Sequence, residues 1–204
     1  AALRGLSVAL IERGDFGSGT SQNSLKIIHG GLRYLQDGNV SRIRMMARER
    51  TTWMKIAPHL IHPLPCLMPT TQKMYRSRLT MGIALMANDY LSFDRNQLAD
   101  PEKDLFDGMI VSQRELSRIL PGYDVSTSTG AAVWYDAQIY NSERLLLEFI
   151  LSAMQTGAEV ANYVEAINFL QQGNRIIGVR AKDFQTGQIF DIQPRAAELI
   201  QAMQ

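Results

Sequence analysis

The chain has 204 residues, which is enough to bury a core as one large domain or two small ones. Its 46% hydrophobic and 20% charged residues are typical of a soluble globular protein, and a net charge of +1 excludes a general attraction to nucleic acid or acidic lipid. The single cysteine, Cys66, excludes an internal disulfide and indicates a reducing compartment such as the cytoplasm. No apolar run approaches the roughly 20 residues that a membrane span needs.

The first predicted elements are a helix end, a strand and a loop of small residues. Arg4-Gly5 is typical of the last turn of a helix and its left-handed stop. The apolar run from Leu6 to Glu12 predicts a strand that ends in an acid, and residues 13–23 after it are rich in glycine, serine and threonine. This order is typical of the second strand of a dinucleotide-binding βαβ unit, whose terminal acid accepts hydrogen bonds from a ribose.

Glu12 lies too near the start of the chain for a whole unit of this kind. The glycine fingerprint would lie about 20 residues before the acid, whereas only 11 residues precede Glu12. We therefore expect an internal fragment that lacks the phosphate-binding turn and alone binds the nucleotide weakly or not at all. The alternative for Glu12 is a solvated acid at a strand end. The loop residues Gly17, Gly19, Thr20 and Ser21 have two interpretations, a phosphate-binding loop and an ordinary surface loop.

Three cationic or ionisable residues surround a double glycine in the next segment. Lys26, His29 and Arg33 lie within a few residues of Gly30-Gly31. Adjacent glycines indicate a backbone pressed against a flat or bulky group, and the three donors suit an anionic substrate or an electron-rich cofactor ring. The alternative is a bend between two short helices with solvated cations.

The middle of the chain predicts helices separated by proline-rich segments. Apolar residues at helical spacing predict a helix over Asn39 to Ala57, which Pro58 stops. Four prolines exclude a helix from residues 58–69, within which Leu64 to Met68 is interpreted as a strand. The remaining helices predicted here cover Leu79 to Leu91 and Gln113 to Leu120.

Strands predominate towards the C-terminus. Gly130 to Tyr140 predicts a strand, and an amphipathic helix capped by Asn141 or Ser142 follows it and ends at Gly157. Further strands joined by hairpin turns at Gly173-Asn174 and Thr186-Gly187 are predicted over Glu159 to Leu170, Arg175 to Lys182 and Gly187 to Ile192. We therefore expect a mixed α/β chain in which residues 1–58 and 131–204 belong to one Rossmann-like nucleotide-binding domain and residues 59–130 form an insertion.

The predicted helix over Asn39 to Ala57 carries a row of basic residues. We interpret this row as one basic face, which is either solvated or in contact with membrane phospholipid. Its members are Arg42, Arg44, Arg48, Arg50 and Lys55.

Two further sets of residues are weak candidates for a metal site and for a nucleophile. His59 and His62 have a metal-ligand spacing, but the flanking prolines exclude the helix that would bring them together, so we expect no metal site. Cys66 has no cationic neighbour in the sequence, which favours a buried small hydrophobe over a nucleophile.

Several segments together resemble one family. They are Arg4-Gly5, Val8 to Asp15, Ser18 to Ser21, the run from Lys26 to Leu35, Met54 to Leu60, Trp134 to Ile139 and Asp183 to Phe190. This set is similar to the FAD-dependent glycerol-3-phosphate dehydrogenases, within the D-amino-acid-oxidase-like flavoproteins. The run Lys-x-x-His-Gly-Gly-Leu-Arg-Tyr-Leu is the most specific part. The chain would be somewhat less than half of the usual family length.

The resemblance implies an enzyme that oxidises sn-glycerol 3-phosphate to dihydroxyacetone phosphate. Hydride would pass to FAD and electrons would leave to quinone or oxygen, in the cytoplasm or peripherally on the inner membrane. Glu12 would bind the FAD ribose, while Thr20, Ser21 and Ser24 would line the phosphates and ribityl chain. Beside the isoalloxazine would lie Lys26, His29, Gly30 and Gly31. His29 and Arg33 would be catalytic, with Arg33 on the phosphate side of the substrate. Residues 59–130 would then be a segment of the substrate domain.

Two departures from the family pattern leave alternatives open. Leu25 replaces a small hydroxyl residue, so a hydrogen bond to the cofactor would be missing, and Leu199 to Gln204 replaces a glycine-containing strand end. These departures favour a non-catalytic α/β domain that serves structure or interaction. A third alternative is a related flavoprotein oxidase that acts on another small substrate.

Overall fold

The computed structural model describes residues 1–98 and 100–193. The chain divides into two compact units. The discontinuous unit comprises Ala1–Ser24 and Ser142–Gln204, and the central unit comprises Leu25–Asn141. The boundaries between units therefore fall at residues 24/25 and 141/142, whereas the sequence analysis expects them at 58/59 and 130/131. The assignment of a cofactor or a substrate to each unit stays a prediction.

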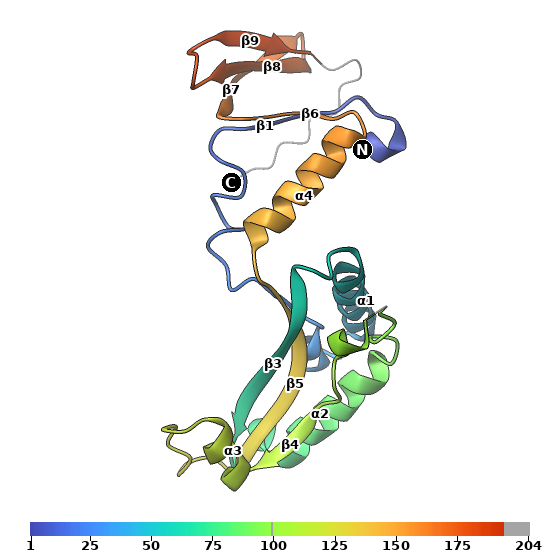
Figure 1. The fold of residues 1–204 in the computed structure, drawn as a ribbon, viewed down its shortest axis with the longest axis vertical. Coiled ribbons are helices and arrows are strands. Elements are labelled where there is room, and N and C mark those ends of the chain that lie inside the picture. Colours follow the sequence, from blue (N-terminus) through green and yellow to red (C-terminus); the bar gives the residue numbers. More distant parts are fainter. Residues whose placement is uncertain (99, 194–204) are drawn as a thin grey trace. The chain divides into compact units, whose positions relative to one another are not determined.

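The discontinuous unit contains a small parallel sheet, an antiparallel sheet and one long helix (Figure 1). Its elements are η1 (Ala2–Arg4), β1 (Ala9–Glu12), α4 (Ser142–Gln155), β6 (Glu159–Asn162), β7 (Val164–Gln172), β8 (Arg175–Asp183) and β9 (Ile189–Ile192). β1 pairs in parallel with β6, and β7, β8 and β9 form an antiparallel meander. The helix end predicted at Arg4-Gly5 is confirmed, because Gly5 ends η1 with a φ of 77°.

Two strand predictions in this unit are wrong in their bounds. The first strand begins at Ala9 rather than Leu6. The predicted strand over Glu159 to Leu170 is two strands, because Tyr163 adopts a positive φ of 57° that breaks the extended backbone. The Tyr163 N–H donates to the carbonyl of Gly14 at 3.2 Å, which ties the break to the loop after β1. The altered strand end at Leu199 to Gln204 lies outside the described residues.

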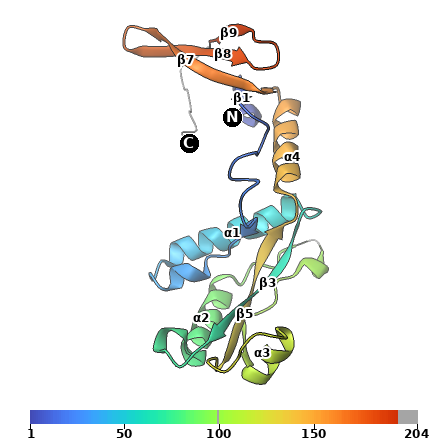
Figure 2. The ribbon, with the colours of Figure 1, turned by 90° about the vertical axis from the view of Figure 1, so that its left-hand side faces the viewer.

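The central unit is built around the long strand β5 (Figure 2). Its elements are β2 (Ile27–Ile28), η2 (Leu32–Leu35), α1 (Val40–Ile56), β3 (Ile61–Thr70), η3 (Met74–Arg76), α2 (Arg78–Leu91), η4 (Pro101–Lys103), β4 (Met109–Ser112), α3 (Gln113–Ile119) and β5 (Gly130–Ile139). β5 pairs along its whole length with β3, while β2 and β4 pair with its two ends, all antiparallel.

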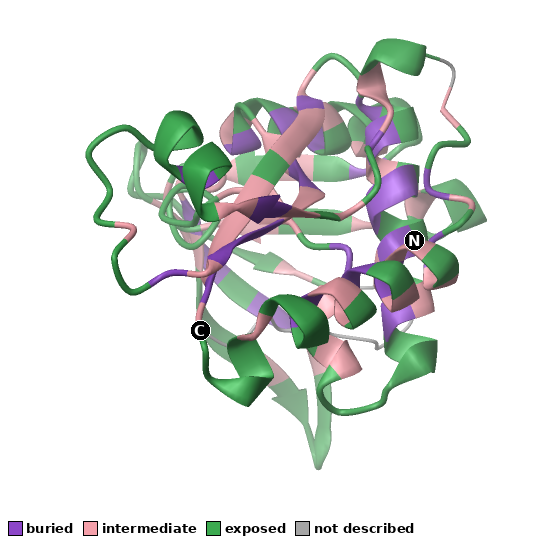
Figure 3. Ribbon diagram, turned by 90° about the horizontal axis from the view of Figure 1, so that it is seen from below, coloured by how far each residue is buried: buried purple, intermediate pink, exposed green. Residues whose placement is uncertain are grey.

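Side-chain caps begin two helices of the central unit. Asn39 caps α1 by accepting a hydrogen bond from the Arg42 N–H at 3.0 Å. Ser112 and Glu115 form a capping box at the start of α3. Core residues of α2 and α3 pack on β5 in two clusters, and Figure 3 colours the buried residues of the chain purple. The buried members are Met81, Leu85 and Ala132 in one cluster and Val111, Leu116 and Ala131 in the other.

The strand β3 is longer than its prolines suggest. Pro63, Pro65 and Pro69 occupy alternate positions of β3, opposite Ala137, Tyr135 and Ala131. Because backbone N–H groups alternate between the two edges of a strand, all three prolines fall on the edge that does not pair with β5. Proline on a free edge costs no ladder hydrogen bond and blocks pairing with another chain. The strand β4, which also pairs with β5, is absent from the sequence predictions.

Candidate functional site

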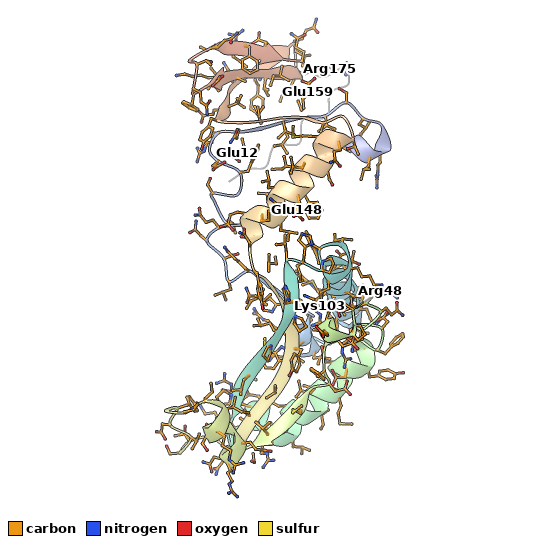
Figure 4. The ribbon with its side chains drawn as sticks, viewed as in Figure 1. Glu12, Arg48, Lys103, Glu148, Glu159 and Arg175 are labelled. Atoms are coloured by element: carbon orange, nitrogen blue, oxygen red, sulfur yellow. The ribbon has the colours of Figure 1, made fainter. Side chains whose placement is uncertain are left out.

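Glu12 is the last residue of β1 and lies beside Asn162 of the parallel strand β6. Figure 4 labels its side chain where the strand gives way to the loop. One oxygen, Oε1, accepts a hydrogen bond from the Gly14 N–H at 2.8 Å, and no hydrogen bond from a described residue reaches the other oxygen. Ligands of doubly wound folds bind at the carboxyl ends of parallel strands. Glu12 therefore stands where a ribose-binding acid is expected, with one oxygen ready to accept a hydroxyl donor.

The loop after β1 borders an open depression of about 460 Å³. Glu12 and the residues from Gly17 to Ser21 line it, together with Leu146 of α4. Gly17 has a φ of 78°, and a Cβ there would lie 3.0 Å from the Leu146 side chain, so the loop requires glycine at this position. The Ser142 hydroxyl donates to the Ser21 carbonyl at 2.6 Å, which ties the loop to the start of α4.

The hydrogen-bonding groups that line this depression are suited to a nucleotide. Backbone N–H groups of a glycine-rich loop and the Thr20 and Ser21 hydroxyls can approach phosphate oxygens closely. The adjacent carboxylate of Glu12 suits a ribose. Ser24 does not line the depression, and its hydroxyl contacts the Ser21 carbonyl at 3.5 Å.

The central unit holds the other predicted site residues on the segment from Lys26 to Arg33. Lys26 adopts a left-handed φ of 56° immediately before β2, a conformation that costs a non-glycine residue about 1–3 kcal/mol. His29 follows β2, and Gly30 and Gly31 are buried before η2. Arg33 is exposed, and no described residue gives its side chain a hydrogen bond or an ion pair.

The double glycine is explained by neighbours within the chain. A Cβ on Gly30 would lie 2.1 Å from Nη1 of Arg50. Gly31 has a φ of 94°, and a Cβ there would lie 3.2 Å from the backbone of Ile43. The sequence analysis expects the glycines to approach a flat or bulky group. That group includes the Arg50 guanidinium and helix α1.

Asp136 of β5 is the centre of the contacts around this segment. Its Oδ1 accepts hydrogen bonds from the Gly30 N–H at 2.7 Å and from Arg50 Nη1 at 3.0 Å. Its Oδ2 lies 2.9 Å from Nδ1 of His29. The Trp134 indole N–H lies 3.5 Å from the same oxygen. One carboxylate therefore holds the histidine, the first glycine and the arginine together.

Arg50 and Asp136 form a buried ion pair, with 2% and 4% of their surfaces exposed. Burial lowers the pKa of the Arg50 guanidinium, and the charge of Asp136 opposes that shift. Arg50 Nη1 also donates to the Tyr135 carbonyl at 2.9 Å, while its Nε has no partner. Removing a charge from water costs several kcal/mol for each buried ion, so buried charges occur in pairs. The ion pair therefore fixes the position of α1 against β5.

The interpretation of α1 as carrying one solvated basic face is wrong for two residues. Arg50 is buried, and Arg44 forms a bidentate ion pair with Asp94 at 2.7 and 2.8 Å. Arg42, Arg48 and Lys55 are exposed. The signal for Arg50 was present in the sequence, because Arg50 shares the buried stripe of α1 with Ile43, Ala47 and Met54.

Of the remaining candidates, Cys66 lies close enough to Asp136 and Arg50 for their charges to act on its thiol, whereas His62 contacts Tyr140 and Lys103. His62 stacks on Tyr140 with ring centroids 4.3 Å apart, and Lys103 Nζ lies 2.5 Å from its Nδ1. Burial raises the pKa of the Cys66 thiol, which weakens it as a nucleophile. Across residues 1–98 and 100–193, no group of three or more metal-ligating side chains occurs.

A sequence profile described as "DAO: FAD dependent oxidoreductase" matches residues 1–198. The chain belongs to this family of FAD-dependent oxidoreductases. A glycerol-3-phosphate dehydrogenase from Synechocystis sp. is 35% identical over 98% of the chain, and the mitochondrial glycerol-3-phosphate dehydrogenase of Homo sapiens is 35% identical over 96%. The chain spans 35% and 27% of the lengths of these two curated relatives.

The solved structures support the fold of this oxidoreductase family. The glycerol-3-phosphate dehydrogenase from Bacillus halodurans, solved with FAD, matches with a TM-score of 0.66 and 22% identity. The match covers 95% of this chain and 29% of that one. At this identity the likeness shows the fold alone, and it confirms the mixed α/β flavoprotein fold that the sequence predicts.

Proposed function

We propose that this chain is part of a flavin-dependent enzyme that oxidises sn-glycerol 3-phosphate to dihydroxyacetone phosphate. The observation that carries the proposal is the buried Asp136 carboxylate, which holds His29 and the Gly30 N–H together within the segment that ends at Arg33. The segment thus has a fixed imidazole and, four residues later, an exposed guanidinium. Relatives named as glycerol-3-phosphate dehydrogenases support the choice of substrate.

Two sets of residues would contact FAD, one in each unit. In the discontinuous unit Glu12 would accept hydrogen bonds from the ribose, and Thr20, Ser21 and Ser24 would contact the phosphates and ribityl chain. In the central unit Lys26, His29, Gly30 and Gly31 would lie beside the flavin ring. Bound FAD would supply the hydride acceptor, and quinone or oxygen would be the final electron acceptor.

His29 and Arg33 would act on the substrate. A guanidinium binds a phosphate through two parallel hydrogen bonds, so Arg33 would hold the phosphate of glycerol 3-phosphate. His29 would take the proton from the hydroxyl on the carbon that loses hydride, which leaves a ketone. A positioned general base of this kind accelerates a reaction by about 10²–10⁴-fold.

The test is substrate oxidation by the full-length protein. Purified protein should carry flavin absorbance and reduce an artificial electron acceptor when glycerol 3-phosphate is added. Arg33→Met should raise KM for glycerol 3-phosphate, whereas Arg48→Met, on the exposed side of α1, should leave KM unchanged. Protein without flavin, or flavoprotein that oxidises amino acids but not glycerol 3-phosphate, would overturn the proposal.

A non-catalytic α/β domain is the second candidate, and Leu25 favours it. Leu25 is 80% exposed, and its aliphatic side chain offers no hydrogen bond at a position where the family resemblance implies a small hydroxyl residue. Its carbonyl accepts from the Gln138 amide at 3.1 Å, so the backbone is held irrespective of the side chain. Flavin-free full-length protein that folds with normal stability would favour this candidate.

We further propose a cytoplasmic location with peripheral contact to the inner membrane. Apolar side chains form a row on the outer face of α2, each at least 61% exposed: Leu79, Ile83, Met86 and Tyr90. The cationic residues Lys73, Arg76 and Arg78 flank its start, a combination suited to anionic lipid. No helix in the described part of the chain is long and apolar enough to cross a membrane. Ile83→Glu should abolish sedimentation with anionic vesicles, and Arg114→Glu on α3 should not.

A further inference from the structure

The contact between His29 and Asp136 determines which ring nitrogen of the histidine carries hydrogen. Oδ1 of Asp136 is occupied by two donors, the Gly30 N–H at 2.7 Å and Arg50 Nη1 at 3.0 Å. Oδ2 faces Nδ1 of His29 at 2.9 Å. A carboxylate oxygen paired with a buried guanidinium accepts hydrogen bonds, so the neutral ring must donate through Nδ1.

We propose that Asp136 is a positioning residue that holds neutral His29 in its Nδ1–H form and leaves Nε2 as the proton acceptor. The inference rests on the proposed function, because it assigns to Nε2 the hydroxyl proton of the substrate. The side chain of His29 is 63% exposed although its Nδ1 contacts a buried carboxylate. The ring thus has one anchored edge and one accessible edge, as a general base requires.

Gly30 and Arg50 make this arrangement rigid. The Arg50 guanidinium fills the space where a Cβ of residue 30 would lie, so only glycine lets the backbone N–H and the guanidinium reach the same carboxylate oxygen. With Oδ1 held by both donors, Asp136 cannot rotate without losing two charge-assisted or buried hydrogen bonds. Oδ2 is therefore fixed towards His29.

Replacing Asp136 by asparagine keeps nearly the same side-chain shape but predicts the opposite tautomer of His29. The single carbonyl oxygen of the amide must face the Gly30 N–H and Arg50, because both are donors. The amide NH₂ then faces Nδ1 of His29 and donates to it. Asp136→Asn should therefore switch His29 to the Nε2–H form, in which Nε2 is no longer a base.

The experiment is ¹⁵N NMR of the histidine side chains in the full chain, at a pH where titration shows the His29 ring to be neutral. His59 and His62 serve as internal controls, and the variant His29→Gln assigns the signals. The expected result is Nδ1–H for His29 in the native chain and Nε2–H in Asp136→Asn, with His59 and His62 unchanged. Native His29 in the Nε2–H form, or a form unchanged by the substitution, would overturn the inference.

Two further arms keep the outcome decisive. If Asp136→Asn does not fold because Arg50 is left as an unpaired buried charge, the double variant Arg50→Met/Asp136→Asn removes that charge and should show the same switch. In flavin-loaded full-length protein, Asp136→Asn should lower kcat about 10²–10⁴-fold with little change in KM. Native protein with Nδ1–H but no oxidation of glycerol 3-phosphate would refute the proposed function and leave the tautomer assignment standing.

Discussion

Replacing Arg50 by methionine should strongly destabilise the central unit. Arg50 is 2% exposed and pairs with Asp136, which is 4% exposed. Removing one partner of a buried ion pair costs about 3–5 kcal/mol, because the other charge stays buried without compensation. Asp136 would keep its donors from Gly30 and His29, so we place the loss near the lower limit, at about 3 kcal/mol.

The assay is urea unfolding of the chain followed by tryptophan fluorescence. Both tryptophans, Trp53 and Trp134, lie in the central unit, so the signal reports on the unit that contains Arg50. The control is Arg48→Met, on the same helix (Figure 4), whose side chain is 68% exposed and whose Nε lies 3.9 Å from Asp94. This change should alter the free energy of unfolding by no more than about 0.5 kcal/mol. A loss below about 1 kcal/mol for Arg50→Met would refute the reasoning, since it would mean that the charge of Asp136 is compensated elsewhere.

Three other changes test separate parts of the structure. Gly30→Ala places a Cβ 2.1 Å from Arg50 Nη1 and should cost about 1–3 kcal/mol in the same unfolding assay. The control is Gly82→Ala in the same unit, where the nearest atom to the new Cβ lies at 3.6 Å, and this change should be close to neutral. Equal effects of the two changes would contradict the packing argument. The hydrogen bond from the Arg44 guanidinium lowers the pKa of Asp94 below its ordinary value of 3.8. The Asp94 carboxylate therefore stabilises the fold above pH 3.8 and loses that contribution as the pH falls through its lowered pKa. The difference in free energy of unfolding between the native chain and Asp94→Asn should shrink on acidification, and a difference that stays constant with pH would contradict the ion pair. Leu25→Thr should increase the amount of flavin that the full-length protein retains on dialysis, measured by absorbance. Unchanged retention would contradict the claim that a hydroxyl group at position 25 strengthens cofactor binding.

The sequence predicts those parts of the fold that depend on local rules. The spacing of the apolar residues and the stop at Pro58 predict α1 to within one residue at each end. Gly5 and Gly157 end their helices with positive φ, as their positions after each helix suggest. Local patterns also locate the double glycine, although not the atoms that it approaches.

The parts that sequence reasoning missed depend on contacts between distant segments. The apolar stripe of α1 indicates that Arg50 is buried, but only the structure shows which residue pairs with it, because Arg50 and Asp136 are 86 residues apart. The prolines of β3 look incompatible with a long strand because proline removes a hydrogen-bond donor, but that donor faces a free edge here. Tyr163 divides the strand predicted over Glu159 to Leu170, because its positive φ breaks the extended backbone and its N–H donates to the carbonyl of Gly14 in the loop after β1.

The most direct test of the central claim is anaerobic mixing of the full-length protein with glycerol 3-phosphate while flavin absorbance is followed. The account predicts that the substrate reduces the flavin in a single turnover, and that Asp136→Asn and His29→Gln slow this reduction while Arg48→Met does not. Flavin that stays oxidised in the native protein, or that is reduced equally fast when His29 is replaced, would contradict it.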